Sequence, residues 1–264
     1  HRQAAGSLGI DRGGGGAARG FAHVGVIQVL EENGFKVDYI AGTSAGSLVA
    51  AIYASGKNGQ QLQQAAQAMD EAAITDWQLP LFNRGMLRGE ALARYVSEQV
   101  GGKSIEQMRV PLGIVATDLG SGQGVLFQRG DAATAVRASS AVPSVFEPVK
   151  INGREFVDGG LVSPVPVRYA RQMGAELVIA VDISAAPEGN LSQSPLQILL
   201  QTFAIMGKSI NTFELKEADL LVRPALNGMK GADFGSKLKT IEAGRAAMLA
   251  ALPGLRVAME KLAR

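Results

Sequence analysis

The sequence predicts a layered α/β fold that is built around a parallel sheet. Short apolar runs of strand-forming residues alternate with longer segments of helical periodicity along most of the chain. Near the N-terminus, a strand at residues 8–10, a glycine-rich loop, a helix at 21–33 and a strand at 37–41 form a unit whose two strands run parallel. With 264 residues, of which 47% are hydrophobic and 19% charged, the chain can bury a substantial core.

The first half of the chain contains several segments whose apolar pattern predicts a helix or a strand. Apolar residues at helical spacing predict the first helix: Phe21, Val24, Ile27 and Leu30. Gly34 gives that helix a natural C-terminal stop. After the strand at 37–41 and a tight turn, a buried helix is expected at 47–54. Helical spacing of apolar residues predicts further helices at 60–73, 90–100 and 131–139. Short apolar or alternating runs predict strands at 112–117, 124–128 and 155–157.

The second half continues the alternation of strands and helices. We expect a helix at 165–173, a buried strand at 177–182, a linker-like loop at 185–194, an amphipathic helix at 195–215 and a strand at 220–223. A final helix spans 241–262, with a break expected at Pro253-Gly254. The sequence thus indicates one domain over residues 1–264, with a loose N-terminus at 1–7 and a helical extension at 224–264.

The composition excludes several classes of function. A net charge of +2 gives no electrostatic reason to expect nucleic acid as a partner. The absence of cysteine excludes disulfides, thiol catalysis and cysteine metal sites. The longest apolar runs fall short of the roughly 18 residues that a membrane-spanning helix needs. A soluble protein, cytoplasmic or peripheral to a membrane, is therefore expected, and its oligomeric state is left open. The chain begins at His1, which is consistent with a trimmed product whose signal or lipoprotein segment has been removed.

The turn after the strand at 37–41 carries the pattern G-x-S-x-G, formed by Gly42, Ser44 and Gly46. In this pattern the serine lies on a sharp strand-to-helix turn, which exposes its hydroxyl and requires small neighbours on both sides. The positive end of the following helix dipole favours negative charge at the serine. Ser44 is therefore the candidate nucleophile. The alternative is a glycine-rich turn that contains a serine by chance.

A serine nucleophile needs a base, and histidine is scarce in this chain. His1 lies at the terminus, and His23 lies in the first turn of a helix, where a packed or capping histidine is expected. A Ser-His-Asp triad is therefore disfavoured. Asp158 ends the strand at 155–157 and precedes two glycines, which puts a carboxylate at the sheet edge where α/β active sites lie. The alternative is that Asp158 is only a turn residue of an Asp-Gly pair.

The glycine-rich loop is the third part of the candidate site. Ester cleavage passes through a tetrahedral oxyanion, and backbone amides that open a helix can stabilise it. The candidate donors are Gly14, Gly15, Gly16 and Ala17. Arg19 either fixes this loop or favours an anionic substrate.

A dinucleotide-binding unit is the competing interpretation of the same loop. It would use Asp38, about twenty residues further on, as the ribose-binding acid. The third glycine is out of register, however, and the second strand leads directly into the serine turn. These departures favour the hydrolase interpretation.

Four segments together resemble the patatin-like phospholipases, within them the bacterial group related to neuropathy target esterase. The segments are GGGGAARGFAHVGV (13–26), GTSAGS (42–47), RASSAVPSVFEPV (137–149) and DGGLVSPVPV (158–167). The resemblance covers residues 8–223 and implies a three-layer α/β/α sandwich with a mainly parallel central sheet. It also implies a Ser44–Asp158 dyad, an oxyanion hole formed by the Gly14–Ala17 amides, and hydrolysis of acyl esters of lipids. No metal or organic cofactor is implied.

A long acyl chain requires an apolar path to the serine. One candidate wall contains Trp77, Leu79, Leu81, Phe82 and Met86. The helix at 195–215 offers another, with Leu196, Leu199, Leu200, Phe203, Met206 and Ile210. Ordinary core packing is the alternative for both. Peripheral membrane contact is left open, since neither segment has a strongly basic polar face.

The substrate is expected to be a lipid or another acyl ester, most simply a phospholipid or lysophospholipid. An acyltransferase or thioesterase would use the same residues. A non-catalytic lipid or nucleotide binder that keeps the glycine loop is the alternative from a different class.

Overall fold

The computed structural model describes residues 4–8, 17–70, 73, 89–143, 146–184, 195–227 and 234–264. The strands in these ranges are β1 (Ala4–Leu8), β2 (Val37–Thr43), β3 (Leu112–Asp118), β4 (Gly124–Phe127), β5 (Val149–Ile151), β6 (Arg154–Asp158), β7 (Leu177–Val181) and β8 (Leu220–Val222). The α-helices are α1 (Ala22–Glu32), α2 (Ala45–Ala54), α3 (Gly59–Gln67), α5 (Glu90–Val100), α6 (Ala132–Ser139), α7 (Val167–Met173), α8 (Pro195–Glu214) and α9 (Phe234–Ala263). Short 3-10 helices are η1 (Ala17–Phe21), η2 (Ile105–Gln107), η3 (Gly159–Leu161) and η4 (Leu215–Glu217).

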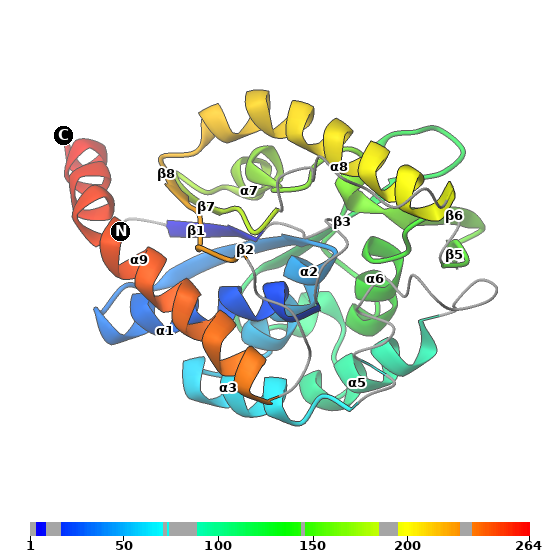
Figure 1. Cartoon of the computed structure of the whole chain (residues 1–264), viewed down its shortest axis with the longest axis horizontal. Coiled ribbons are helices and arrows are strands. Elements are labelled where there is room, and N and C mark those ends of the chain that lie inside the picture. Colours follow the sequence, from blue (N-terminus) through cyan, green and yellow to red (C-terminus); the bar gives the residue numbers. More distant parts are fainter. Residues whose placement is uncertain are drawn as a thin grey trace.

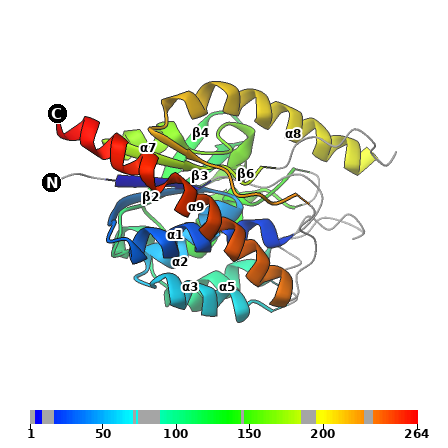
Figure 2. The same cartoon turned by 60° about the vertical axis from the view of Figure 1, so that its left-hand side comes forward.

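One mixed sheet lies between two layers of helices (Figure 1). Helices α1, α2, α3 and α5 cover one face, and α7 and α8 cover the other (Figure 2). Strand pairing runs in the order β5-β6-β3-β2-β1-β7-β8, and β4 adds to β3. The pairs among β1, β2, β3, β7 and β8 are parallel, whereas β4, β5 and β6 pair antiparallel. The predicted α/β/α sandwich with a mainly parallel sheet is confirmed.

Strands β2 and β6 occupy the same edge of β3 and point toward each other. Residues 114–117 of β3 pair with β4 on one edge. On the other edge, Val115 pairs with Thr43 of the parallel strand β2, and Ala116 pairs with Asp158 of the antiparallel strand β6. Because β2 and β6 run in opposite directions along this edge, their carboxyl ends meet at consecutive residues of β3.

The two faces of the sheet bury side chains of different size. On β2, the side chain of Ile40 packs among α1, α2 and α3, whereas Ala41 packs in a smaller cluster with α7. On β7, Ile179 packs in the larger cluster with Ile40, and Val178 packs in the smaller cluster with Ala41. This alternation follows from the two-residue period of a strand. The main hydrophobic core therefore lies on the α1 side of the sheet.

The N-terminal strand differs from the sequence prediction. Residues 1–7 were expected to be loose, with a first strand at 8–10, but Ala4–Leu8 form β1. This strand pairs with β2 on one side and β7 on the other, so it is a central strand of the sheet. Its alanine, glycine and serine residues have low strand propensity, and pairing on both edges overrides that preference.

Two helices also have different ends from those predicted. The helix expected at 60–73 begins as α3 and ends at Gln67. Asp70 Oδ1 then accepts the amide of Ala73 at 2.8 Å, a capping contact that belongs to a helix start. Helix α9 begins before residue 241 and continues through Pro253, where a break was expected. The neighbouring Leu252 and Leu255 are buried, and this packing keeps the helix continuous.

Candidate active site

Ser44 lies between β2 and α2 in a backbone conformation that non-glycine residues rarely adopt. Its φ is 52° and its ψ is −119°. The Ser44 carbonyl accepts hydrogen bonds from the amide of Ser47 at 2.9 Å and from its hydroxyl at 2.6 Å. The Ser44 hydroxyl does not cap α2. The strained turn therefore fixes the backbone and leaves the hydroxyl beside the positive end of the α2 dipole.

Glycine is required on the strand side of this turn. A Cβ atom on Gly42 would lie 2.6 Å from the carbonyl oxygen of Gly46 and 2.6 Å from Cα of Ser47. Both atoms belong to the backbone of α2, which folds back against the end of β2. The small residues of G-x-S-x-G thus allow the helix to start directly behind Ser44.

Asp158 is the last residue of β6, and it is completely buried. Its amide donates to the carbonyl of Ala141 at 3.0 Å, and its carbonyl accepts the Thr117 hydroxyl at 2.9 Å. Its Oδ1 atom accepts the amide of Gly160 at 2.8 Å. The carboxylate is therefore fixed from the backbone and from the side chain, unlike that of an exposed turn aspartate.

The end-to-end arrangement of β2 and β6 relates Ser44 to Asp158. Ser44 follows Thr43, which pairs with Val115, and Asp158 pairs with the next residue of β3. A Cβ on Gly159 would lie 3.1 Å from Cγ2 of Thr43, so the chain after Asp158 passes directly beside the end of β2. Among the hydrogen bonds of the described residues, none joins the two side chains. Such contacts are often longer in an unliganded enzyme than in its reacting complex.

Ser139 is a site residue that the sequence analysis did not single out. It ends α6, and its Oγ atom accepts the amide of Ser44 at 2.8 Å while donating to the carbonyl of Val115. Two residues later, the carbonyl of Ala141 accepts the amide of Asp158. Ser139 and Ala141, from the motif at 137–149, therefore hold both candidate residues in place. The sequence signal for this contact was that residues 137–149 form one of the four segments that resemble the patatin-like phospholipases.

The glycine loop is described only from its end onward. Gly14, Gly15 and Gly16 lie outside the described residues, and Ala17 is the first residue of η1. Arg19 is buried, and its guanidinium donates to the carbonyl of Ile183 at 2.8 and 3.0 Å and to that of Leu226 at 3.3 Å. Arg19 thus fixes the end of the loop to the segments that follow β7 and β8, as one of its two predicted roles requires.

His23 and Asp38 are the residues that a catalytic triad and a dinucleotide site, respectively, would use. His23 is completely buried within α1, as expected for a packed histidine. Asp38 is the second residue of β2, so it lies at the opposite end of that strand from Ser44. A ribose-binding acid would be needed at the carboxyl end of the strand. The position of Asp38 therefore disfavours a dinucleotide site.

Of the two predicted apolar walls, the structure describes the one on α8. The wall at 77–87 lies outside the described residues. On α8, Leu200 is buried in a core cluster and Phe203 packs against it, whereas Met206 is 50% exposed. Helix α8 is therefore partly a core element and partly an exposed surface. Within the described residues, no helix combines the length and apolarity needed to cross a membrane.

The chain has an α/β/α fold with a strained serine turn between β2 and α2. Residues 13–171 match the family described as Patatin-like phospholipase, and the chain belongs to that family. An uncharacterized NTE family protein of Mycobacterium tuberculosis is 38% identical over 176 residues, which are 67% of this chain and 49% of that protein. The human patatin-like phospholipase domain-containing protein 6 is 33% identical over 187 residues, which are 68% of this chain and 14% of that protein. The predicted relationship to the neuropathy target esterase group is confirmed.

The same fold occurs in VipD from Legionella pneumophila. Its crystal structure has a TM-score of 0.54 and 13% sequence identity, with 96% of this chain and 67% of that chain covered. This likeness concerns the fold alone. The chain spans about half the length of the Mycobacterium relatives that it matches.

Proposed function

We propose that this protein is a serine hydrolase that cleaves carboxylic esters of lipids, with Ser44 as nucleophile and Asp158 as base. The observation that carries the proposal is the meeting of β2 and β6 at Val115 and Ala116 of β3. This register brings a strained serine turn and a buried carboxylate to the same point of the sheet. Membership in the patatin-like phospholipase family supports a lipid ester as substrate.

In the proposed reaction, the Ser44 hydroxyl attacks the ester carbonyl carbon while its proton moves to the Asp158 carboxylate. Backbone amides of Gly14–Ala17 would stabilise the tetrahedral oxyanion, a contribution of roughly 3–4 kcal/mol per donor in other hydrolases. The intermediate expels the alcohol, which takes the proton from Asp158 and leaves an acyl group on Ser44. Water then attacks the acyl carbonyl carbon while Asp158 takes its proton, and the fatty acid leaves as that proton returns to the Ser44 oxygen.

An acyltransferase would replace that water by a second alcohol, and a thioesterase would expel a thiolate instead of an alkoxide. Both reactions would use the same acyl-Ser44 intermediate. A panel of short p-nitrophenyl esters, acyl thioesters, lysophospholipids and diacyl lipids separates these activities, with product analysis in the presence and absence of an acceptor alcohol. Labelling by a fluorophosphonate probe that requires Ser44 would support any of them. An unlabelled, folded protein would favour the non-catalytic binder.

We also propose that α8 touches the lipid surface that holds the substrate. Among the described side chains of this helix, four large apolar ones are exposed: Ile198 (53%), Ile205 (55%), Met206 (50%) and Phe213 (68%). Their spacing places them on one side of the helix. Helix α8 forms the outer boundary of its layer (Figure 2). An exposed apolar helix face of this kind is suited to burial at a membrane interface.

A further inference from the structure

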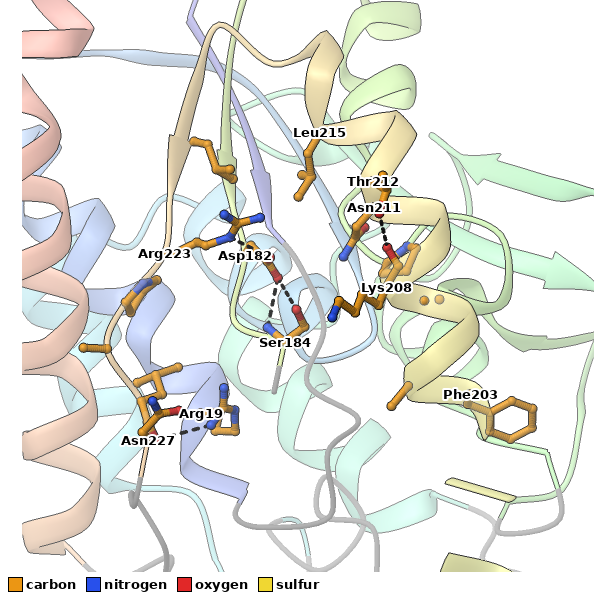
Figure 3. A pocket seen from close by; sticks show the side chains of 18 of the residues that line it. Arg19, Asp182, Ser184, Phe203, Lys208, Asn211, Thr212, Leu215, Arg223 and Asn227 are labelled. Atoms are coloured by element: carbon orange, nitrogen blue, oxygen red, sulfur yellow. Dashed lines mark hydrogen bonds and ion pairs between the residues drawn. The ribbon is translucent and has the colours of Figure 1, made fainter. Parts of the chain in front are cut away.

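A cavity of about 610 Å³ lies beneath α8, beside the candidate active site. Its floor is formed by the segments that follow β7 and β8, and its roof by the inner face of α8 (Figure 3). Gly160 lines the cavity, and the amide of this glycine is hydrogen-bonded to Asp158. A ligand in the cavity would therefore lie next to the segment that holds the proposed base. The volume is typical of a small-molecule site.

The charged lining of this cavity is predominantly positive. Among the described residues, four cationic side chains and one carboxylate line it: Arg19, Lys208, Lys216, Arg223 and Asp182. Arg223 Nε donates to Asp182 Oδ2 at 3.3 Å, which orients the guanidinium along the floor. Within the described residues, the Lys208 ammonium has no hydrogen bond or ion pair, and it extends from α8 into the cavity (Figure 3). The excess of positive charge is suited to an anionic group.

Asn211 provides an independent sign that a polar ligand belongs here. This residue lies one turn after Lys208 on the inner face of α8, and it is only 7% exposed. Within the described part of the chain, its Oδ1 atom is buried without a hydrogen-bond partner. Its amide points toward the cavity (Figure 3). A buried polar atom without a partner is costly unless a ligand satisfies it.

We propose that this cavity binds the phosphate-bearing head group of the lipid substrate, with Lys208 and Asn211 as ligands and Arg223 as a second cation. A phosphate offers several acceptor oxygens, which match an ammonium, an arginine fork and an amide NH₂ donor. The Oδ1 atom of Asn211 would accept a hydrogen bond from a hydroxyl of the attached glycerol. This inference rests on the proposed function, because the acyl ester of the same lipid must reach Ser44.

Binding can be measured without catalysis. sn-Glycerol 3-phosphate should raise the melting temperature of the parent protein at millimolar concentration, whereas glycerol should not. Lys208→Met should abolish this shift and Lys208→Arg should restore most of it. Lys239→Met, which removes an exposed lysine of α9 outside the cavity, is the matched control and should behave as the parent. No shift in the parent would overturn the proposal.

Inorganic phosphate distinguishes a head-group site from a site for the free anion. A head-group site should prefer glycerol 3-phosphate to inorganic phosphate, because the glycerol hydroxyls add contacts with Asn211. Asn211→Leu should remove that preference, and it should not lower the melting temperature, since the Asn211 side chain has no hydrogen-bond partner among the described residues to lose. Equal shifts with both anions in the parent would overturn the head-group assignment.

Kinetics then test the role in hydrolysis. 1-Oleoyl-glycerol 3-phosphate and 1-oleoyl-glycerol differ only in the phosphate, and both can be presented in the same neutral detergent micelles. Lys208→Met should raise KM for the phosphorylated substrate and so lower its kcat/KM roughly tenfold. The kcat/KM for the neutral substrate should be unchanged. Equal effects on both substrates would contradict the proposal. Ser44-dependent hydrolysis of the neutral substrate reports separately on the proposed function.

Discussion

The hydroxyl of Ser139 accepts a hydrogen bond of 2.8 Å from the backbone amide of Ser44. The same hydroxyl donates to the carbonyl of Val115 in the neighbouring strand β3. Ser139 therefore connects the strained serine turn to the strand on which β2 and β6 meet. Because a strained conformation persists only where its surroundings hold it, this hydroxyl helps to position Ser44, the proposed nucleophile.

Ser139→Ala should lower kcat on the order of 10- to 100-fold with little change in KM, since a small displacement of the nucleophile slows attack. Ser140→Ala is the matched control. Ser140 is also buried, and its hydroxyl has no hydrogen-bond partner among the described residues, so its removal should leave kcat unchanged. Kinetics with a soluble p-nitrophenyl ester check both variants. Equal effects of the two substitutions would argue against a positioning role for Ser139.

Ser44→Ala and Asp158→Asn should each lower kcat at least about a thousandfold, because nucleophile and base act as one unit. Asparagine keeps the shape of Asp158 and its bond from Gly160 but cannot take a proton. Circular dichroism should be unchanged in both variants. In a complex with a covalent phosphonate, the distance between the Asp158 carboxylate and Ser44 Oγ should be about 2.6–3.2 Å. High activity of a folded Asp158→Asn variant would exclude the dyad, and a comparable loss in His23→Ala would identify another base.

The sequence could predict Ser44 because its signal is local. The five residues from Gly42 to Gly46 carry the whole steric pattern, and the short strand predicted at 155–157 placed Asp158 at its carboxyl end. The contact between Ser139 and Ser44 joins residues 95 positions apart, so no periodic pattern reports it. Long-range hydrogen bonds of this kind require the folded topology.

The errors in the fold prediction have related physical causes. The strand β1 was missed because Ala4, Ala5 and Gly6 have low strand propensity, and pairing with two neighbours determines their conformation. The break expected at Pro253 did not occur, because packing of the adjacent leucines maintains α9. Helix and strand periods identified most other elements, since their burial follows those periods.

Gly244→Ala should destabilise the protein by about 1–3 kcal/mol, as expected for overpacking against backbone. A Cβ at this position would lie 1.9 Å from the carbonyl oxygen of Ala22, where α9 crosses α1. Gly254→Ala on the same helix is the control, since its Cβ would only meet a methyl group of Leu220 at 3.2 Å. That change should be neutral or stabilise by up to about 1 kcal/mol through helix propensity. Urea unfolding measures both, and a Gly244→Ala variant as stable as the parent would refute the close crossing.

Phe213→Ser should weaken binding to lipid vesicles roughly tenfold, because it removes one large apolar side chain from the exposed face of α8. Leu249→Ser is the control, since this side chain is 49% exposed on α9. It should leave vesicle binding unchanged. Co-sedimentation with phosphatidylcholine–phosphatidylglycerol vesicles measures binding, and hydrolysis of a soluble ester verifies that both variants are folded. If Phe213→Ser binds vesicles as the parent does, α8 is not the lipid-facing element.

Glu214 connects the end of α8 to the serine turn through Ser163. The Ser163 hydroxyl donates to the Glu214 carboxylate at 2.7 and 2.9 Å, and the Ser163 carbonyl accepts the hydroxyl of Thr43 at 2.9 Å. Burial raises the pKa of Glu214 above its ordinary value of 4.5, although hydrogen bonds from Ser163 and the Arg168 amide, and the charge of Arg168, oppose this effect. The folded protein therefore retains a proton on Glu214 at pH values where the unfolded chain has lost it.

This raised pKa predicts how stability changes with pH. The contribution of Glu214 to the free energy of unfolding is fully present below pH 4.5 and is lost as pH rises through the folded-state pKa. Glu214→Gln cannot lose a proton, and its amide still accepts from Ser163. The melting temperature of Glu214→Gln minus that of the parent should therefore increase as pH rises from 4.5 toward neutrality, and then level off. Glu217→Gln, at an exposed glutamate nearby, controls for the loss of one negative charge. A difference that decreases over the same range would mean that the fold stabilises the Glu214 anion.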